Sequence, residues 1–135
     1  MSYTIIIFNA TDAWTNPVYS FKINLVSREL SVEYTNTHGG VTTNGIALNE
    51  SQYNHIKLIA SPNIFEKYRN ESWKIKPEWL LDPYDWKAQF IYDDGTPMLT
   101  LATELQQFSA PPALVTLVNY VMKIGTLGNF GGKVF

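Results

Sequence analysis

The fold is decided by the stretch WKAQFIYDDGTPMLTLATELQQFSAPPALVTLVNYVMKIG, which spans Trp86–Gly125. Its first part alternates apolar and polar residues, reaches the turn sequence Asp94–Gly95, and then alternates again. A two-residue loop at Asp94–Gly95 would place Phe90 opposite Leu99, so that the apolar sets of both strands share one face. We therefore predict a β-hairpin with one apolar face.

The second part of the stretch predicts a helix. Ser109 followed by Ala-Pro-Pro is a typical helix start, since a hydroxyl can cap the helix and prolines fit its first turn. Gly125 is expected to end the helix. The apolar stripe between them has helical spacing and consists of Leu114, Leu117, Val118 and Val121. We predict that this helix packs on the apolar face of the hairpin.

The front of the chain predicts three more strands. Tyr3–Phe8 is expected to be buried on both faces, because β-branched residues fill both. Val18–Val26 and Leu30–Tyr34 alternate and predict a second hairpin with Ser27–Arg28 as its loop. That loop pairs Leu25 with Leu30, Ile23 with Val32, and Phe21 with Tyr34.

The middle of the chain predicts a loop and two helices. Asn36–Gly45 is polar and glycine-bearing, so we expect a loop. Asn49 is expected to cap a helix together with Gln52, three residues on. Ser61–Pro62 ends that helix and opens a short second one through Tyr68.

Together these elements predict one α+β domain over residues 1–125, followed by a glycine-rich tail over residues 126–135. The domain consists of an antiparallel sheet, formed by two hairpins plus an N-terminal strand, with helices packed on one face.

Composition restricts the classes of partner. The 135 residues are 45% hydrophobic and 16% charged, with a net charge of −2 and a pI near 5.6. This acidic balance argues against nucleic-acid binding, which requires basic surface. No apolar run reaches the length of a membrane span, and no targeting segment is recognised, so we expect no membrane partner and a cytoplasmic location. The absence of cysteine excludes disulfides and thiolate chemistry.

Candidate catalytic residues are sparse. No histidine spacing fits a zinc site, and no glycine pattern fits a phosphate or dinucleotide loop, so we predict no metal, no cofactor and no enzymatic activity. His55 is expected at the surface. A small enzyme centred on His38, with Asp85 or Asp94, remains an alternative.

The irregular segment Asn70–Asp85 is the predicted partner-binding site. Its aromatic residues are typical binding anchors, and acidic residues would form a rim around them. The aromatic anchors are Trp73, Trp79 and Tyr84, and the acidic rim is Glu71, Glu78, Asp82 and Asp85. The same rings could instead attach the segment to the core. In a carbohydrate-binding module, Trp73 or Trp79 would serve as a stacking platform.

Several motifs across Gly39–Lys123 resemble the emfourin type of small bacterial protein. They are a Gly-Gly loop, the helix sequence LNESQYNHIKLIASPNIF, the strand and turn DWKAQFIYDDG, and the closing helix PPALVTLVNYV. Emfourins inhibit metalloproteases, so the resemblance implies a non-catalytic inhibitor. We therefore expect a non-enzymatic module that binds another protein, as an inhibitor or immunity-type protein. The identity of the partner and the oligomeric state stay open.

Overall fold

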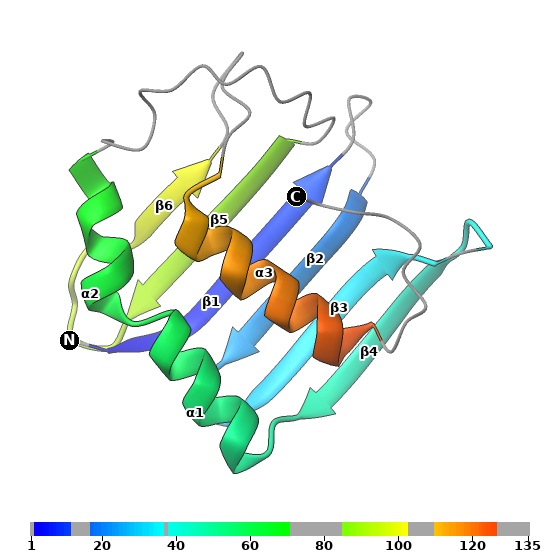
Figure 1. Ribbon diagram of the computed structural model, residues 1–135, viewed down its shortest axis with the longest axis horizontal. Helices are drawn as coiled ribbons and strands as arrows, with labels where there is room; N and C mark the ends of the chain where they lie inside the picture. The colour runs from blue at the N-terminus through cyan, green and yellow to red at the C-terminus, as the bar shows by residue number, and fades with distance from the viewer. Residues whose placement is uncertain (1, 12–16, 37, 71–84, 103–109, 127–135) are drawn as a thin grey trace.

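The computed structural model describes residues 2–11, 17–36, 38–70, 85–102 and 110–126. Figure 1 shows the helices and strands in chain order. Their bounds are β1 Tyr3–Thr11, β2 Pro17–Asn24, β3 Glu29–Thr35, β4 Val41–Ala47, α1 Glu50–Ile59, α2 Pro62–Phe65, the 3₁₀ turn η1 Glu66–Asn70, β5 Asp85–Tyr92, β6 Leu99–Ala102 and α3 Pro112–Gly125.

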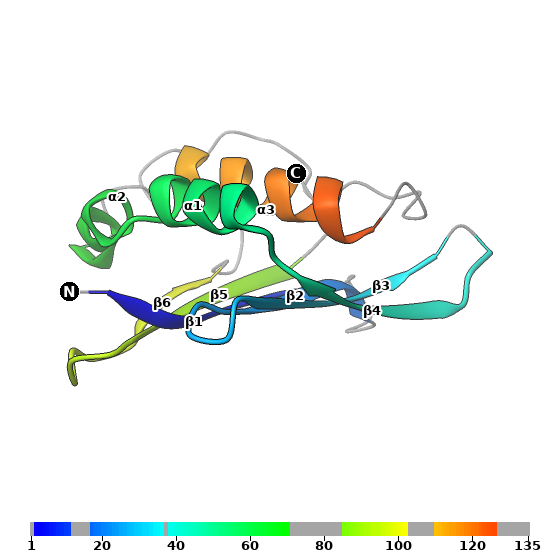
Figure 2. The same cartoon turned by 90° about the horizontal axis from the view of Figure 1, so that it is seen from below.

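The strands of the described residues form one six-stranded sheet in the order β4-β3-β2-β1-β5-β6. Every neighbouring pair is antiparallel. The helices cover one face of this sheet and leave the other open (Figure 2). The predicted α+β fold, with an antiparallel sheet and helices on one face, is confirmed.

The core lies between the sheet and the helices, and the strands contribute alternate residues to it. Ile6 and Phe8 of β1 are buried there, whereas Ile5 and Ile7 are only half-buried on the open face. The expectation that β1 is buried on both faces is therefore wrong, because no helix of the described residues packs on its second face. The other buried strand residues are Tyr3, Ala10, Tyr19, Phe21, Ile23, Leu30, Val32, Tyr34, Trp86, Ala88, Phe90, Tyr92, Leu99 and Leu101.

The hairpin of β5 and β6 has the predicted register, with Phe90 opposite Leu99. Gly95 has a φ of +80°, a conformation that glycine adopts without strain. The Asp94 carboxylate accepts a hydrogen bond of 3.0 Å from the Thr96 backbone N–H and so stabilises the turn.

The hairpin of β2 and β3 differs from its predicted register by two residues. Phe21 lies opposite Val32 and Ile23 opposite Leu30. The turn has four residues instead of two, because the Asn24 side chain accepts hydrogen bonds from the next residues and Arg28 takes a φ of +60°. A shift of two residues keeps every side chain on its face, so the predicted core face remains right.

Strand β4 corrects a second expectation, since Val41–Ala47 falls largely within the segment predicted as a loop. It pairs with β3 along its whole length, from Glu29 opposite Ala47 to Thr35 opposite Val41. The prediction failed because the side of β4 toward the helices includes the polar residues Thr42 and Asn44. The sequence of β4 therefore lacks the alternation of apolar and polar residues that predicts a strand.

Helix α1 begins as predicted. The Asn49 side chain accepts from the Gln52 backbone N–H at 2.8 Å, and the Gln52 side chain accepts from the Asn49 N–H at 3.0 Å. This reciprocal pair satisfies two donors that a helix start leaves unpaired. The short second helix also forms, as α2 followed by η1.

Helix α3 begins at Pro112 with Pro111 as its cap, and Ser109, the predicted cap, lies outside the described residues. Gly125 is the last helical residue, but it has no positive φ, and Thr126 is the C-cap. The reason for glycine here is packing: a Cβ at this position would lie 2.7 Å from Cγ1 of Val32. The predicted helix end at Gly125 is right, and packing against Val32 explains the glycine there.

A polar cluster attaches η1 to the β5–β6 hairpin. Arg69 donates to the Glu66 carboxylate and, at 3.0 Å, to the backbone oxygen of Pro97. The Tyr92 hydroxyl donates to the same carboxylate. The cluster therefore joins the helix layer to the turn that leads into β6.

Candidate functional site

Most of the predicted partner-binding residues fall outside the described residues. These are Glu71, Trp73, Glu78, Trp79, Asp82 and Tyr84. Asp85 is the first residue of β5, where its backbone pairs with Thr11. Within the described residues, the exposed large hydrophobic side chains are Val26, Val41, Leu58 and Met98, and none of them is aromatic.

The candidate catalytic residues are far apart. His38 lies in the β3–β4 loop, where its backbone N–H donates to the Asn36 side chain at 2.9 Å. Asp94 lies in the β5–β6 turn, at the opposite end of the strands from His38. The two ends of a strand as long as β1 are about 25 Å apart, so His38 and Asp94 are separated by about that distance. Asp85 lies at the same end as His38, but β2 and β1 intervene, a separation of about 14 Å over three strand spacings. The structure does not bring these residues together.

His55 is exposed on α1, as predicted for a surface residue, and its ring contacts Tyr120 of α3 with centroids 4.4 Å apart. This contact joins the two helices above the sheet. The His55 ring is therefore part of the contact between α1 and α3.

The outer edge of β4 is the most distinctive surface. Two backbone hydrogen bonds flank the ladder, from Asn36 N–H to Gly40 oxygen and from Leu48 N–H to Arg28 oxygen, at 2.8 and 2.9 Å. Both continue the register of the β3–β4 ladder. In antiparallel pairs the hydrogen-bonded positions recur at every second residue.

The alternation assigns a direction to each backbone group of β4. Thr42, Asn44 and Ile46 are the hydrogen-bonded residues that face β3. The backbone N–H and C=O groups of the intervening residues point outward, and no other described segment bonds to them. These outward residues are Val41, Thr43, Gly45 and Ala47, which we call the β4 edge.

The side chains of β4 that face the helices hold the end of α3. Asn44 donates to the Gly125 backbone oxygen at 3.1 Å. The Tyr34 hydroxyl of β3 donates to the Thr126 oxygen at 3.0 Å. Two helix carbonyls are thereby satisfied by the sheet, and β4 is fixed in place beneath the helix.

Among the described residues, the β4 edge shows none of the features that usually protect an edge against strand addition. It is seven residues long, contains no charged residue and no proline, and pairs with β3 without a bulge. All four residues of the β4 edge are exposed, and Val41 is 69% exposed. Gly45 leaves open space, since a Cβ built there has no heavy atom within 4 Å.

The opposite edge strand, β6, is different. It has only four residues, and Arg69 bonds to the backbone oxygens of Pro97 and Met98 just before it. The chain immediately after Ala102 lies outside the described residues. The β4 edge is therefore the longer of the two edges of the described sheet.

A pocket of about 290 Å³ lies among α1, the start of β1 and the β2–β3 turn. Its walls include Tyr3, Leu25, Tyr53, Ile56 and Lys57. The guanidinium of Arg28 lies 4.1 Å from the centroid of the Tyr53 ring. This volume is at the small end of the range for ligand pockets, about 300–1,000 Å³, so it does not by itself indicate a ligand.

The described residues contain no group of three or more metal-ligating side chains. None of the helices in the described ranges is long and apolar enough to cross a membrane.

Sequence reasoning missed the β4 edge because it expected a loop there. The available signal was the pair of β-branched threonines after Val41, together with Ile46, in a run that has strand propensity. No protein-family model matches this chain, and comparison with curated proteins finds no significant match.

Proposed function

We propose that this protein is a non-enzymatic protein-binding module, an inhibitor or immunity-type protein, and that the partner binds by adding a strand to the β4 edge. The observation that carries the proposal is the row of outward backbone groups on an exposed, uncharged strand. An extended segment can bond to such a row through its own main chain. Because β4 is held by β3 and by the end of α3, little ordering is required of it on binding.

Two features of the sequence support the same class of function. The resemblance to emfourin-type inhibitors implies a binder without catalysis. The segment Asn70–Asp85, with Trp73, Trp79 and Tyr84 among acidic residues, remains a proposed second contact for the partner. A cytoplasmic location remains a prediction from the sequence.

The test is a proline at a position whose N–H points outward. Thr43→Pro removes one donor from the β4 edge and spares the bonds to β3, and proline is tolerated on edge strands. Thr43→Val keeps the donor and serves as the matched control. The partner is captured from source cells with the wild-type protein, purified, and titrated against each variant.

We expect Thr43→Pro to weaken binding at least about tenfold, equivalent to about 1.4 kcal/mol. Thr43→Val should bind like the wild type, and thermal melting should show that both variants are folded. Undiminished binding by a folded Thr43→Pro protein would contradict strand addition at β4.

A further inference from the structure

We infer that the strand received by β4 belongs to another protein and is basic, with a lysine or arginine opposite Gly45. The inference rests on the proposed function and names the chemistry of the partner. It starts from the open face of the sheet, where β3 presents two glutamates beside the β4 edge.

The register places these glutamates on either side of Gly45. Gly45 lies opposite Ser31, while Glu29 and Glu33 lie opposite Ala47 and Thr43. Both glutamates are exposed, and no ion pair reaches either of them from the described residues. The open face beside β4 therefore carries two carboxylates with a position between them that has no side chain.

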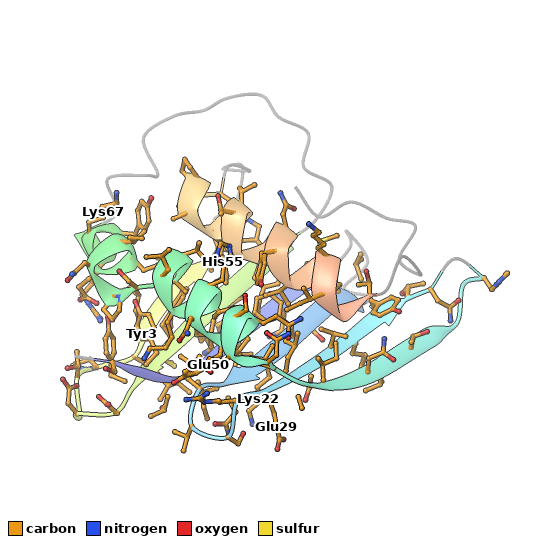
Figure 3. All side chains as sticks on the ribbon, turned by 60° about the horizontal axis from the view of Figure 1, so that its bottom comes forward. Tyr3, Lys22, Glu29, Glu50, His55 and Lys67 are labelled. Atoms are coloured by element: carbon orange, nitrogen blue, oxygen red, sulfur yellow. The ribbon has the colours of Figure 1, made fainter. Side chains whose placement is uncertain are left out.

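Lys22 of β2 is the nearest cation in the ladder. It lies opposite Ser31 and therefore diagonal to both glutamates. Figure 3 shows Lys22 and Glu29 on the side of the sheet away from the helices. One lysine faces two carboxylates, so this part of the open face retains a net negative charge.

Gly45 gives a partner side chain access to these carboxylates. A strand added to β4 lies about 10 Å from β3, two strand spacings away. The side chain of a partner residue opposite Gly45 can extend over the Gly45 backbone. Gly45 has no side chain of its own, and a Cβ built there has no heavy atom within 4 Å. A long basic side chain can lie across that gap toward Glu29 and Glu33, whereas a short one cannot.

A second copy of this chain fits less well. Antiparallel pairing of β4 with itself about Asn44 would place Thr43 opposite Gly45 and Val41 opposite Ala47. The strand VTTNGIA contains no basic residue, so pairing with a second copy would bring no further cation to the glutamates of either copy. Charge complementarity therefore favours a basic segment of another protein.

The inference is tested on the full chain with two synthetic probes. One is a capped octapeptide that alternates valine and lysine, and the other alternates valine and glutamate. Both are titrated while the backbone amide signals of β4 are followed by NMR. We expect the lysine peptide to bind at least about tenfold more tightly, to shift the Thr43 and Gly45 amides, and to lose affinity with added salt.

Two variants assign the effect to the glutamates and the gap. The double change Glu29→Gln and Glu33→Gln should reduce the preference for lysine several-fold, and Gly45→Thr should do the same by filling the gap. Glu50→Gln removes a carboxylate from the start of α1, in the helix layer, and should leave the preference unchanged (Figure 3).

The outcomes separate this inference from the proposed function. Equal affinity for both peptides, or no saturable binding of the lysine peptide up to about 1 mM, overturns the basic partner. The basic partner is also overturned if light scattering shows that the wild-type protein is a dimer and that Thr43→Pro dissociates it, because a second copy would then occupy the β4 edge. If Thr43→Pro weakens binding of the captured partner but the glutamate changes do not alter the preference for lysine, strand addition stands and the inference of a basic partner is wrong. If the lysine peptide binds Thr43→Pro as well as the wild type, its binding is non-specific attraction, and the inference is wrong.

Discussion

Gly125 occupies a position where one methyl group decides whether α3 can lie on the sheet. An added Cβ would lie 2.7 Å from the buried side chain of Val32. Sequence patterns identify this glycine as a helix end, but they do not show that its neighbour in space is a strand residue 93 positions earlier.

We predict that Gly125→Ala lowers the free energy of unfolding by about 1–2 kcal/mol. Overpacking costs about 1–3 kcal/mol, and the better helix propensity of alanine returns up to about 1 kcal/mol. Gly45→Ala is the control, because its Cβ would meet no atom within 4 Å. Urea unfolding measures both, and a Gly125→Ala protein as stable as the wild type would contradict the close contact.

Glu66 is expected to make the stability of the fold depend on pH in the acid range. Hydrogen bonds from Arg69 lower the pKa of the Glu66 carboxyl, partial burial opposes them, and the Tyr92 hydroxyl lowers the pKa further. A carboxyl whose pKa is lower in the folded state stabilises the fold above its unfolded pKa, near 4.3. That contribution is lost as the pH falls through the folded pKa.

We therefore expect Glu66→Gln to be less stable than the wild type at neutral pH, with the difference shrinking below about pH 4. The side chain is 31% exposed, so solvent keeps the effect modest. Chemical unfolding at a series of pH values measures it. Parallel profiles for the two proteins would show that Glu66 contributes no pH dependence.

At the scale of elements, local patterns predicted those parts of the fold that depend on neighbouring residues. The β5–β6 register follows from Asp94–Gly95, and the start of α1 follows from Asn49 and Gln52. The register of β2 with β3 was missed because the Asn24 side chain lengthens the turn. Strand β4 was missed because its pairing depends on β3 rather than on its own alternation.

The segment Asn70–Asp85 has its own test, since its rings can serve a partner or the core. Trp79→Ala is expected to weaken partner binding by about 2 kcal/mol or more with nearly unchanged stability. Melting temperature and partner affinity are measured on the same protein. Lost stability with intact binding would assign Trp79 to the core and contradict its role as an anchor.

At the scale of the whole molecule, the sequence predicted two hairpins and a strand but not their order. β1 pairs with both β2 and β5, so the N-terminal strand lies between the two hairpins. This order depends on contacts between residues far apart in the chain, such as Phe8 with Ala88, which are 80 positions apart and which no local pattern contains. It also keeps His38 away from Asp85 and places β4 at the outer edge of the described sheet.

The central claim is that β4 offers an unpaired edge to a partner, and backbone amide hydrogen exchange tests it residue by residue. In the free protein, the amides of Thr42, Asn44 and Ile46 should exchange slowly, while those of the β4 edge exchange fast. Addition of the captured partner should slow amide exchange at the β4 edge at least about tenfold. This factor is the equilibrium equivalent of one hydrogen bond of about 1.4 kcal/mol. Slow exchange of the β4 edge in the free protein, or unchanged fast exchange in the complex, would contradict the claim.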